Sequence, residues 1–134
     1  MIHLDTSFLV DLLREAAGGG EGRASRFLEG VVDEELGISV FVACELAAGA
    51  AMSTRPAREK RRVDQLCEGL HVEYPDERFA TVYGSLLAAQ ERAGGRISTM
   101  DLLIATSALV GGAPLVTRNA KDFSRVPGLD VLSY

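Results

Sequence analysis

Four acidic residues of this chain stand where buried or ordered elements are expected to begin, and they are the residues most able to do chemistry. They are Asp5, Glu45, Asp101 and Asp122. An unpaired carboxylate in apolar surroundings costs several kcal/mol, and no Lys or Arg adjoins Asp5 or Glu45 to pair with them. A divalent cation shared by the group would offset that cost. The pattern therefore points to a metal-dependent enzyme.

Two of these acids have a structural explanation at the start of a helix. Asp5 could cap the helix expected to begin near Ser7, although Thr6 and Ser7 could also do so. Asp101 follows Ser98 at the spacing of a capping box, in which the acid bonds back to the start of the helix. That motif prefers Glu or Gln over the shorter Asp, so both explanations of Asp101 stay open.

The other two acids have weaker structural explanations. Glu45 could lie on a partly exposed rim, but its helical neighbours three and four residues away are apolar or small and none is cationic. Asp122 lies in the segment 119–123, which is typical of a turn, where exposed Asp is common. The four acids together are more specific than any one of them.

Short strands alternate with helices in the pattern of apolar residues. The expected strands are residues 2–5, 36–39, 71–74, 114–117 and 129–132, and the expected helices are 8–15, 23–34, 41–52, 56–70, 76–93 and 100–110. Helix 41–52 is apolar on most faces, which predicts a buried helix. The alternation predicts an α/β fold with a parallel sheet covered on both faces. Sites in such sheets gather at the carboxyl ends of strands, where Asp5 and Asn119 fall.

Length and composition indicate one domain, residues 1–134, with an ordinary soluble composition of 47% hydrophobic and 25% charged residues. The apolar segments are broken well before the ~20 residues that a membrane span needs, and the start of the chain lacks the basic region of a signal peptide. We therefore expect a cytoplasmic protein. Cys44 and Cys67 lack the spacing of a zinc site and are expected to be buried small hydrophobes. His3 and His71 are expected to be structural.

The net charge of −5 counts against simple binding of a phosphate backbone. It loses force if several acids form one metal site, because bound cations cancel their charge. A local basic run also exists, which could guide a nucleic acid or could be a solvated surface. Its members are Arg55, Arg58, Lys60, Arg61 and Arg62.

Four short motifs occur in a familiar order. Asp5-Thr6-Ser7 follows the first strand, Glu45 lies in a helix, Asp101-Leu102-Leu103-Ile104-Ala105 opens another, and Leu115-Val116-Thr117-Arg118-Asn119-Ala120-Lys121-Asp122-Phe123 comes last. Over residues 2–131 the chain resembles the PIN-domain ribonucleases, in particular the VapC toxins of toxin–antitoxin pairs. The resemblance implies a three-layer sandwich with a short central parallel sheet. It also places the family's three most regular acidic positions at Asp5, Glu45 and Asp101.

The resemblance leaves the fourth site position open between Asn119 and Asp122. It implies a Mg²⁺ cofactor, with Mn²⁺ as an alternative, held by the three regular acids. Thr6 and Thr117 match small hydroxyl positions beside the acids, and they and Asn119 could hydrogen-bond to the metal ligands.

The activity that the resemblance implies is endonucleolytic hydrolysis of RNA, with Arg118 and Arg96 as candidate RNA contacts. The implied partners are a VapB-like antitoxin and a second copy of the chain, with contacts at the apolar segments 8–13 and 41–52, which could equally be core. The alternative is a non-catalytic regulatory or antitoxin-binding module that keeps the fold. A phosphatase of the aspartyl-phosphate type would need a second Asp where Ser7 stands, and a receiver module would need paired acids near Asp5.

Overall fold

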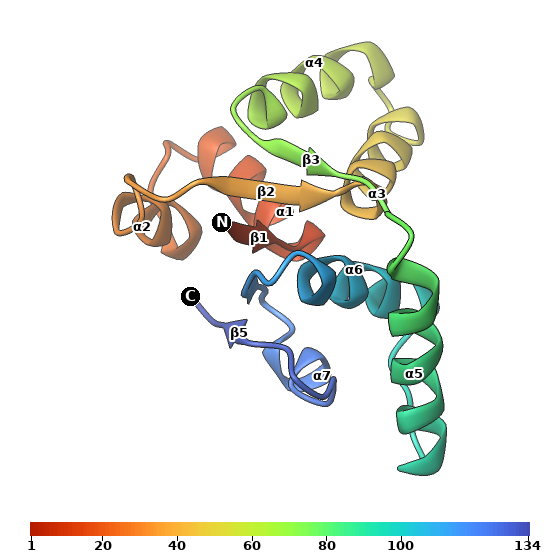
Figure 1. Cartoon of the computed structure of the whole chain (residues 1–134). Helices are drawn as coiled ribbons and strands as arrows, with labels where there is room; N and C mark the ends of the chain where they lie inside the picture. Colours follow the sequence, from red (N-terminus) through yellow and green to blue (C-terminus); the bar gives the residue numbers. More distant parts are fainter.

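Five short parallel strands form the single sheet of the molecule, in the order β3-β2-β1-β4-β5. The computed structural model describes all residues, 1–134 (Figure 1). The first strand is central, with Ile2 opposite Leu36 on one side and His3 opposite Leu115 on the other. The strands are β1 Ile2–Leu4, β2 Leu36–Ser39, β3 His71–Glu73, β4 Leu115–Val116 and β5 Val131–Leu132.

Seven helices connect the strands and cover the sheet. Parallel strands need right-handed crossovers, so the strand order places α1 to α4 on one face and α5 to α7 on the other, as Figure 1 shows. The expected α/β sandwich is therefore confirmed. The helices are α1 Thr6–Ala17, α2 Arg23–Glu29, α3 Val40–Ala51, α4 Pro56–Cys67, α5 Phe79–Arg92, α6 Thr99–Val110 and α7 Ala120–Phe123.

The central strand β1 and the helices packed on its two faces form the core. All of β1 is buried, and Phe8 and Leu9 of α1 are fully buried against it. On the opposite face Ile104 and Ala105 of α6 are buried in the same cluster. Packing on both faces holds the carboxyl end of β1 in place, and that end positions Asp5.

Helix α3 differs from the expectation of a buried helix. Its buried residues, Val42, Leu46 and Ala50, are four apart and form one stripe, which is the pattern of a helix that packs on one face. Its opposite face is exposed and is made of small residues, including Ala47, Ala48 and Gly49. Alanine-rich sequence made all faces look apolar, but only one stripe reaches the core.

Three smaller expectations were also wrong. Cys44 is exposed, whereas Cys67 is partly buried, and neither forms a disulfide. The helix expected over residues 23–34 ends at Glu29, because Gly30 caps it and turns follow. Residues 119–123, expected as a turn, contain the short helix α7. No helix combines the length and apolar character that a membrane crossing requires.

Candidate active site

Three of the four predicted acids meet at one cleft. Asp5 directly follows β1, Glu45 lies in the middle of α3, and Asp101 lies in the first turn of α6. The cleft has a volume of about 540 Å³ and no hydrophobic residue lines it. Its lining consists of Asp5, Thr6, Ser7, Glu45, Asp101, Arg118 and Asn119.

Asp5 is a buried carboxylate that hydroxyl groups hold in place. Its side chain is nearly inaccessible, at 4% exposure, and its Oδ2 accepts hydrogen bonds from Thr117 Oγ1 at 2.7 Å and Ser7 Oγ at 2.8 Å. Asp5 stands at the N-cap position of α1 but makes no capping hydrogen bond. The capping explanation is therefore wrong for Asp5.

Ser7 is a site residue that the sequence reasoning missed, since it was considered only as a helix cap. Its Oγ donates to Asp5, lies 3.2 Å from Thr117 Oγ1, and accepts the backbone N–H of Arg118 at 3.1 Å. It thus ties the loop after β4 to the start of α1. Only the proximity of β1 and β4 in the sheet reveals this role.

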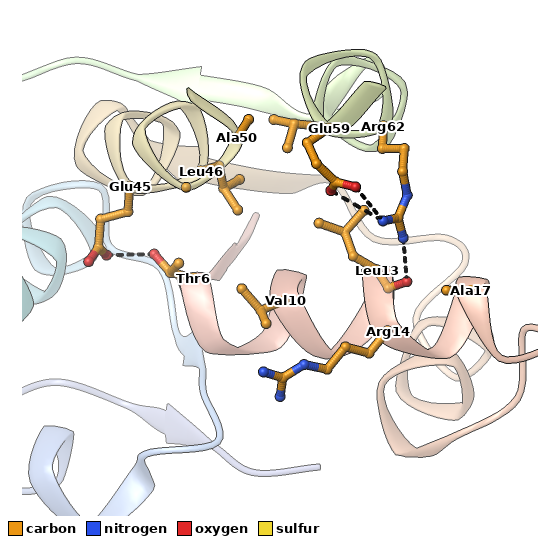
Figure 2. Close-up of a pocket in the computed structure, with 12 residues that line it drawn as sticks. Thr6, Val10, Leu13, Arg14, Ala17, Glu45, Leu46, Ala50, Glu59 and Arg62 are labelled. Carbon is orange, nitrogen blue, oxygen red and sulfur yellow. Dashed lines mark hydrogen bonds and ion pairs between the residues drawn. The ribbon is translucent and has the colours of Figure 1, made fainter. Parts of the chain in front are cut away.

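Glu45 reaches the same cleft from α3. Thr6 Oγ1 donates to Glu45 Oε1 at 2.6 Å across the gap between α1 and α3 (Figure 2). No ion pair neutralises Glu45. The Glu45 carboxylate therefore lines the cleft with its charge unpaired, and the Thr6 hydroxyl fixes one of its two oxygens.

Asp101 belongs to the cleft rather than to a complete capping box, because its carboxylate accepts no hydrogen bond from the backbone N–H of Ser98. Its backbone N–H donates to Ser98 Oγ at 3.2 Å, so Ser98 caps α6 as expected. Its carboxylate nevertheless lines the cleft, where burial and then the charge of Asp5, with smaller contributions from Glu45 and Asp122, raise its pKa. The Ser98 hydroxyl opposes this rise in pKa. Asp101 thus experiences the charge of the other acids.

The two candidates for the fourth site position occupy different places. Asn119 lines the cleft, whereas Asp122 does not and instead accepts a hydrogen bond from Asn119 Nδ2 at 3.0 Å. Thr117 also stays out of the cleft, fully buried behind Asp5, and accepts the Asn119 N–H at 2.9 Å. Asn119 therefore lines the cleft, whereas Asp122 lies outside its lining, although its charge contributes to the raised pKa of Asp101.

Of the two predicted RNA contacts, Arg118 and Arg96, only the first lies at the cleft. Arg118 lines the cleft, and its guanidinium lies 2.6 Å from Asp11 Oδ1. Arg96 does not line it and forms an ion pair with Glu91 at 3.4 Å. No member of the basic run on α4 lines the cleft either, and Arg62 is tied to Glu59 and to the Leu13 carbonyl.

Comparison with known proteins explains this arrangement. The family model of the PIN domain matches residues 2–129 of the chain. The chain belongs to the PIN-domain family. Among relatives of this PIN domain, ribonuclease VapC1 of Haemophilus influenzae is 31% identical over 126 residues, which cover 94% of this chain and 92% of the relative. The tRNA(fMet)-specific endonuclease VapC of Salmonella typhimurium is 32% identical over 94 residues, or 70% of this chain and 71% of the relative.

The fold of this PIN domain matches that of a solved VapBC complex. A crystal structure of VapBC2 from Rickettsia felis, bound to a DNA fragment from their promoter, matches with a TM-score of 0.91 at 28% identity. The match covers 100% of this chain and 99% of the VapBC2 chain. The protein is therefore a VapC-type PIN ribonuclease, as its sequence resemblance predicted.

The acids of this PIN domain are gathered but not tightly clustered. No three acidic, histidine or cysteine side chains lie close enough together in this conformation to form a metal-binding group. No protein donor bonds to Asp5 Oδ1 or Glu45 Oε2, because the hydroxyl bonds engage only the other oxygen of each carboxylate. One oxygen of each acid therefore remains available to a ligand in the cleft.

Proposed function

We propose that this PIN domain is an endoribonuclease that hydrolyses RNA phosphodiester bonds with a divalent cation held by Asp5, Glu45 and Asp101. The observation that carries the proposal is a polar cleft where three carboxylates converge without a neutralising ion pair. The proposed products carry a 5′-phosphate and a 3′-hydroxyl. The ribonuclease names of relatives that span nearly the whole chain support the reaction class.

The donor set in the cleft fits a hard cation. Mg²⁺ and Mn²⁺ prefer oxygen ligands, and the cleft offers carboxylate oxygens and the Asn119 amide but neither sulfur nor imidazole. Burial, and after it the charge of Asp5, raises the pKa of Asp101, and a cation in the cleft would relieve the second of these causes. When bound, a divalent cation supplies Lewis-acid polarisation of the phosphate and lowers the pKa of a water molecule.

The protein groups have separate tasks in this proposal. Thr117 and Ser7 hold Asp5 Oδ2, so that Oδ1 faces the cleft in one orientation. Thr6 does the same for Glu45, which either contributes a ligand oxygen or accepts the proton of the attacking water. Asn119, rather than Asp122, takes the fourth position, where its amide orients a water or ligand without adding charge. Arg118 at the edge of the cleft contacts RNA, and Arg96 remains the weaker candidate.

A VapB-like antitoxin is the proposed partner, since matching structures are VapBC complexes. A groove of about 310 Å³ runs from the Thr6–Glu45 hydrogen bond along α1, α3 and α4 to Arg62 (Figure 2). Val10 and Leu13 of α1 and Leu46 and Ala50 of α3 give it an apolar lining, with Gly49 at its exposed side. An antitoxin segment in this groove would end beside the catalytic acids and block them. We also propose a homodimer, which light scattering of the purified protein would test.

Cleavage of end-labelled RNA by purified protein tests the proposed function. Total RNA and initiator tRNA are incubated with Mg²⁺ or Mn²⁺, beside an EDTA lane and the Asp5→Asn variant. We expect discrete fragments that disappear in both controls. Absence of cleavage by antitoxin-free protein with either metal would instead support a non-catalytic, antitoxin-binding module.

A further inference from the structure

A second polar pocket adjoins the acidic cleft, and Arg118 lines both. This pocket has a volume of about 230 Å³ and lies between α1, the start of α2 and the residues after β5. Arg23 lines its other side, is exposed and forms no ion pair. Two arginines therefore face a space that continues directly from the candidate active site.

Arg118 is held at this boundary from two directions. Its backbone N–H donates to Ser7 Oγ at 3.1 Å, and its guanidinium donates to Asp11 Oδ1 at 2.6 Å. The other oxygen of Asp11 accepts a hydrogen bond from the Tyr134 hydroxyl at 2.5 Å. The Tyr134 ring packs edge-on against the buried Phe8, with ring centroids 4.8 Å apart. Core packing thus fixes Tyr134, Tyr134 fixes Asp11, and Asp11 fixes Arg118.

The two side chains of the Arg118–Asp11 ion pair differ in their exposure to solvent. The Asp11 side chain is only 18% exposed, whereas that of Arg118 is 55% exposed. A guanidinium carries five N–H donors in a planar fork, and the single bond to Asp11 leaves most of them directed at solvent. Arg118 is therefore oriented at its base and open at its tip.

We propose that this second pocket binds the RNA backbone beside the scissile bond, with Arg118 contacting a phosphate and with Asp11 and Tyr134 as its positioning residues. The inference rests on the proposed ribonuclease function. The divalent cation proposed for the cleft offsets the three carboxylates only where it is held, and a cationic side chain at the cleft boundary would hold the neighbouring part of the RNA strand. Arg118 stands at that boundary, and Arg23 offers a second cationic contact within the pocket.

Each negative group of the pocket has a hydrogen-bond partner within the protein. Asp11 is engaged by Arg118 and Tyr134. Glu15 is engaged by the start of α2, where its carboxylate accepts the Ser25 N–H at 2.9 Å and the Ser25 hydroxyl at 2.7 Å. The pocket therefore carries no net positive charge, and a phosphate would be held by the N–H donors of Arg118 that Asp11 does not engage and by Arg23, which forms no ion pair.

Steady-state cleavage of a short fluorophore-labelled RNA tests the inference. For Arg118→Ala we expect KM to rise about tenfold with kcat within about twofold, and the salt dependence of binding to fall by about one phosphate contact. Arg118→Lys should recover part of the loss. Tyr134→Phe keeps the packing on Phe8 and should raise KM about threefold, as expected for a weakened charge-assisted contact. Arg26→Ala, an exposed arginine on α2 outside both pockets, is the matched control.

A double-mutant cycle separates positioning from a structural role. If Tyr134 acts through Arg118, the double variant Tyr134→Phe, Arg118→Ala should have the same KM as the single variant Arg118→Ala. Additive effects on KM, or single variants indistinguishable from Arg26→Ala, would overturn the inference. If the wild-type protein cleaves no RNA, the proposed function fails, and fluorescence anisotropy of RNA binding in EDTA still decides the inference through the same variants.

Discussion

Replacing Thr117 by valine keeps the size of the side chain but removes its hydroxyl, and this loss should destabilise the protein. Thr117 is fully buried, donates to the carboxylate of Asp5 at 2.7 Å and accepts the Asn119 N–H at 2.9 Å. A hydrogen bond to a charged group contributes about 1.5–3 kcal/mol, and an orphaned donor costs about 1 kcal/mol more. Ser7 still bonds to Asp5 in the variant. We therefore expect a loss of about 2–3 kcal/mol in the free energy of unfolding.

Thermal and urea denaturation of the metal-free protein measure this loss. With an entropy of unfolding near 2.1 cal/mol/K per residue, a chain of 134 residues has about 280 cal/mol/K in total. Each 1 kcal/mol then shifts Tm by about 3.6 °C, so Thr117→Val should lower Tm by roughly 7–11 °C. RNA cleavage should fall as well, because Asp5 loses one of the two groups that orient it.

Thr106→Val is the matched control for this prediction. Thr106 is also fully buried, but its hydroxyl donates to the Leu102 carbonyl of its own helix at 2.7 Å. Such a bond adds little, since that carbonyl already belongs to the helix, and we expect a loss of about 0.5 kcal/mol or less. Equal losses for the two valine variants would refute the argument that the Asp5 carboxylate makes Thr117 important.

Other parts of the molecule give three further predictions. Asp101→Asn should raise the unfolding free energy of the metal-free protein by less than about 1 kcal/mol, because burial and nearby acids raise the Asp101 pKa but solvent screens this half-buried carboxylate. Mg²⁺ should raise the Tm of the wild type but not of the variant, and an unchanged metal-free Tm would count against the shared site. Burial lowers the pKa of His3 below its ordinary value of 6.5. The free energy of unfolding should therefore keep its full His3 contribution above pH 6.5 and should fall below that pH, at a slope of at most about 1.4 kcal/mol for each unit of pH. A pH series of Tm checks this, and His3→Leu should remove the dependence. Gly49→Arg should place a side chain in the open space of the groove and weaken antitoxin binding at least about tenfold in a titration, which corresponds to about 1.4 kcal/mol. Gly84→Arg is the control and should have no effect, because Gly84 lies on an exposed stretch of α5 with equal space.

The fold could be predicted because its signals are local. Short apolar strands separated by helical stretches predict a parallel sheet, and all five strands form where expected. The burial of α3 was mispredicted for a physical reason. Alanine and glycine are compatible with core and with surface, so a helix rich in them reveals no polar face even where one side is open.

The site could be predicted only as far as its chemistry is local. A carboxylate after a strand, or at the start of an apolar helix, can be recognised from its neighbours in sequence, which is how Asp5 and Asp101 were found. The hydroxyl network joins residues 110 and 112 positions apart, and Tyr134 lies 123 positions from Asp11. No sequence pattern of helix or strand spans such distances. Only the adjacency of β1, β4 and β5 in the sheet brings these residues together.

Net charge misleads for the same reason. A total of −5 argues against RNA binding, yet the total does not say where the charges lie. Of the 19 acidic residues, three converge on one cleft, where their repulsion favours a cation rather than excluding a substrate. Arg118 stands at the edge of that cleft with its guanidinium exposed. In the proposed complex a phosphate at this edge meets the free N–H donors of Arg118 before it meets the acids, so the placement of charges matters more than their total.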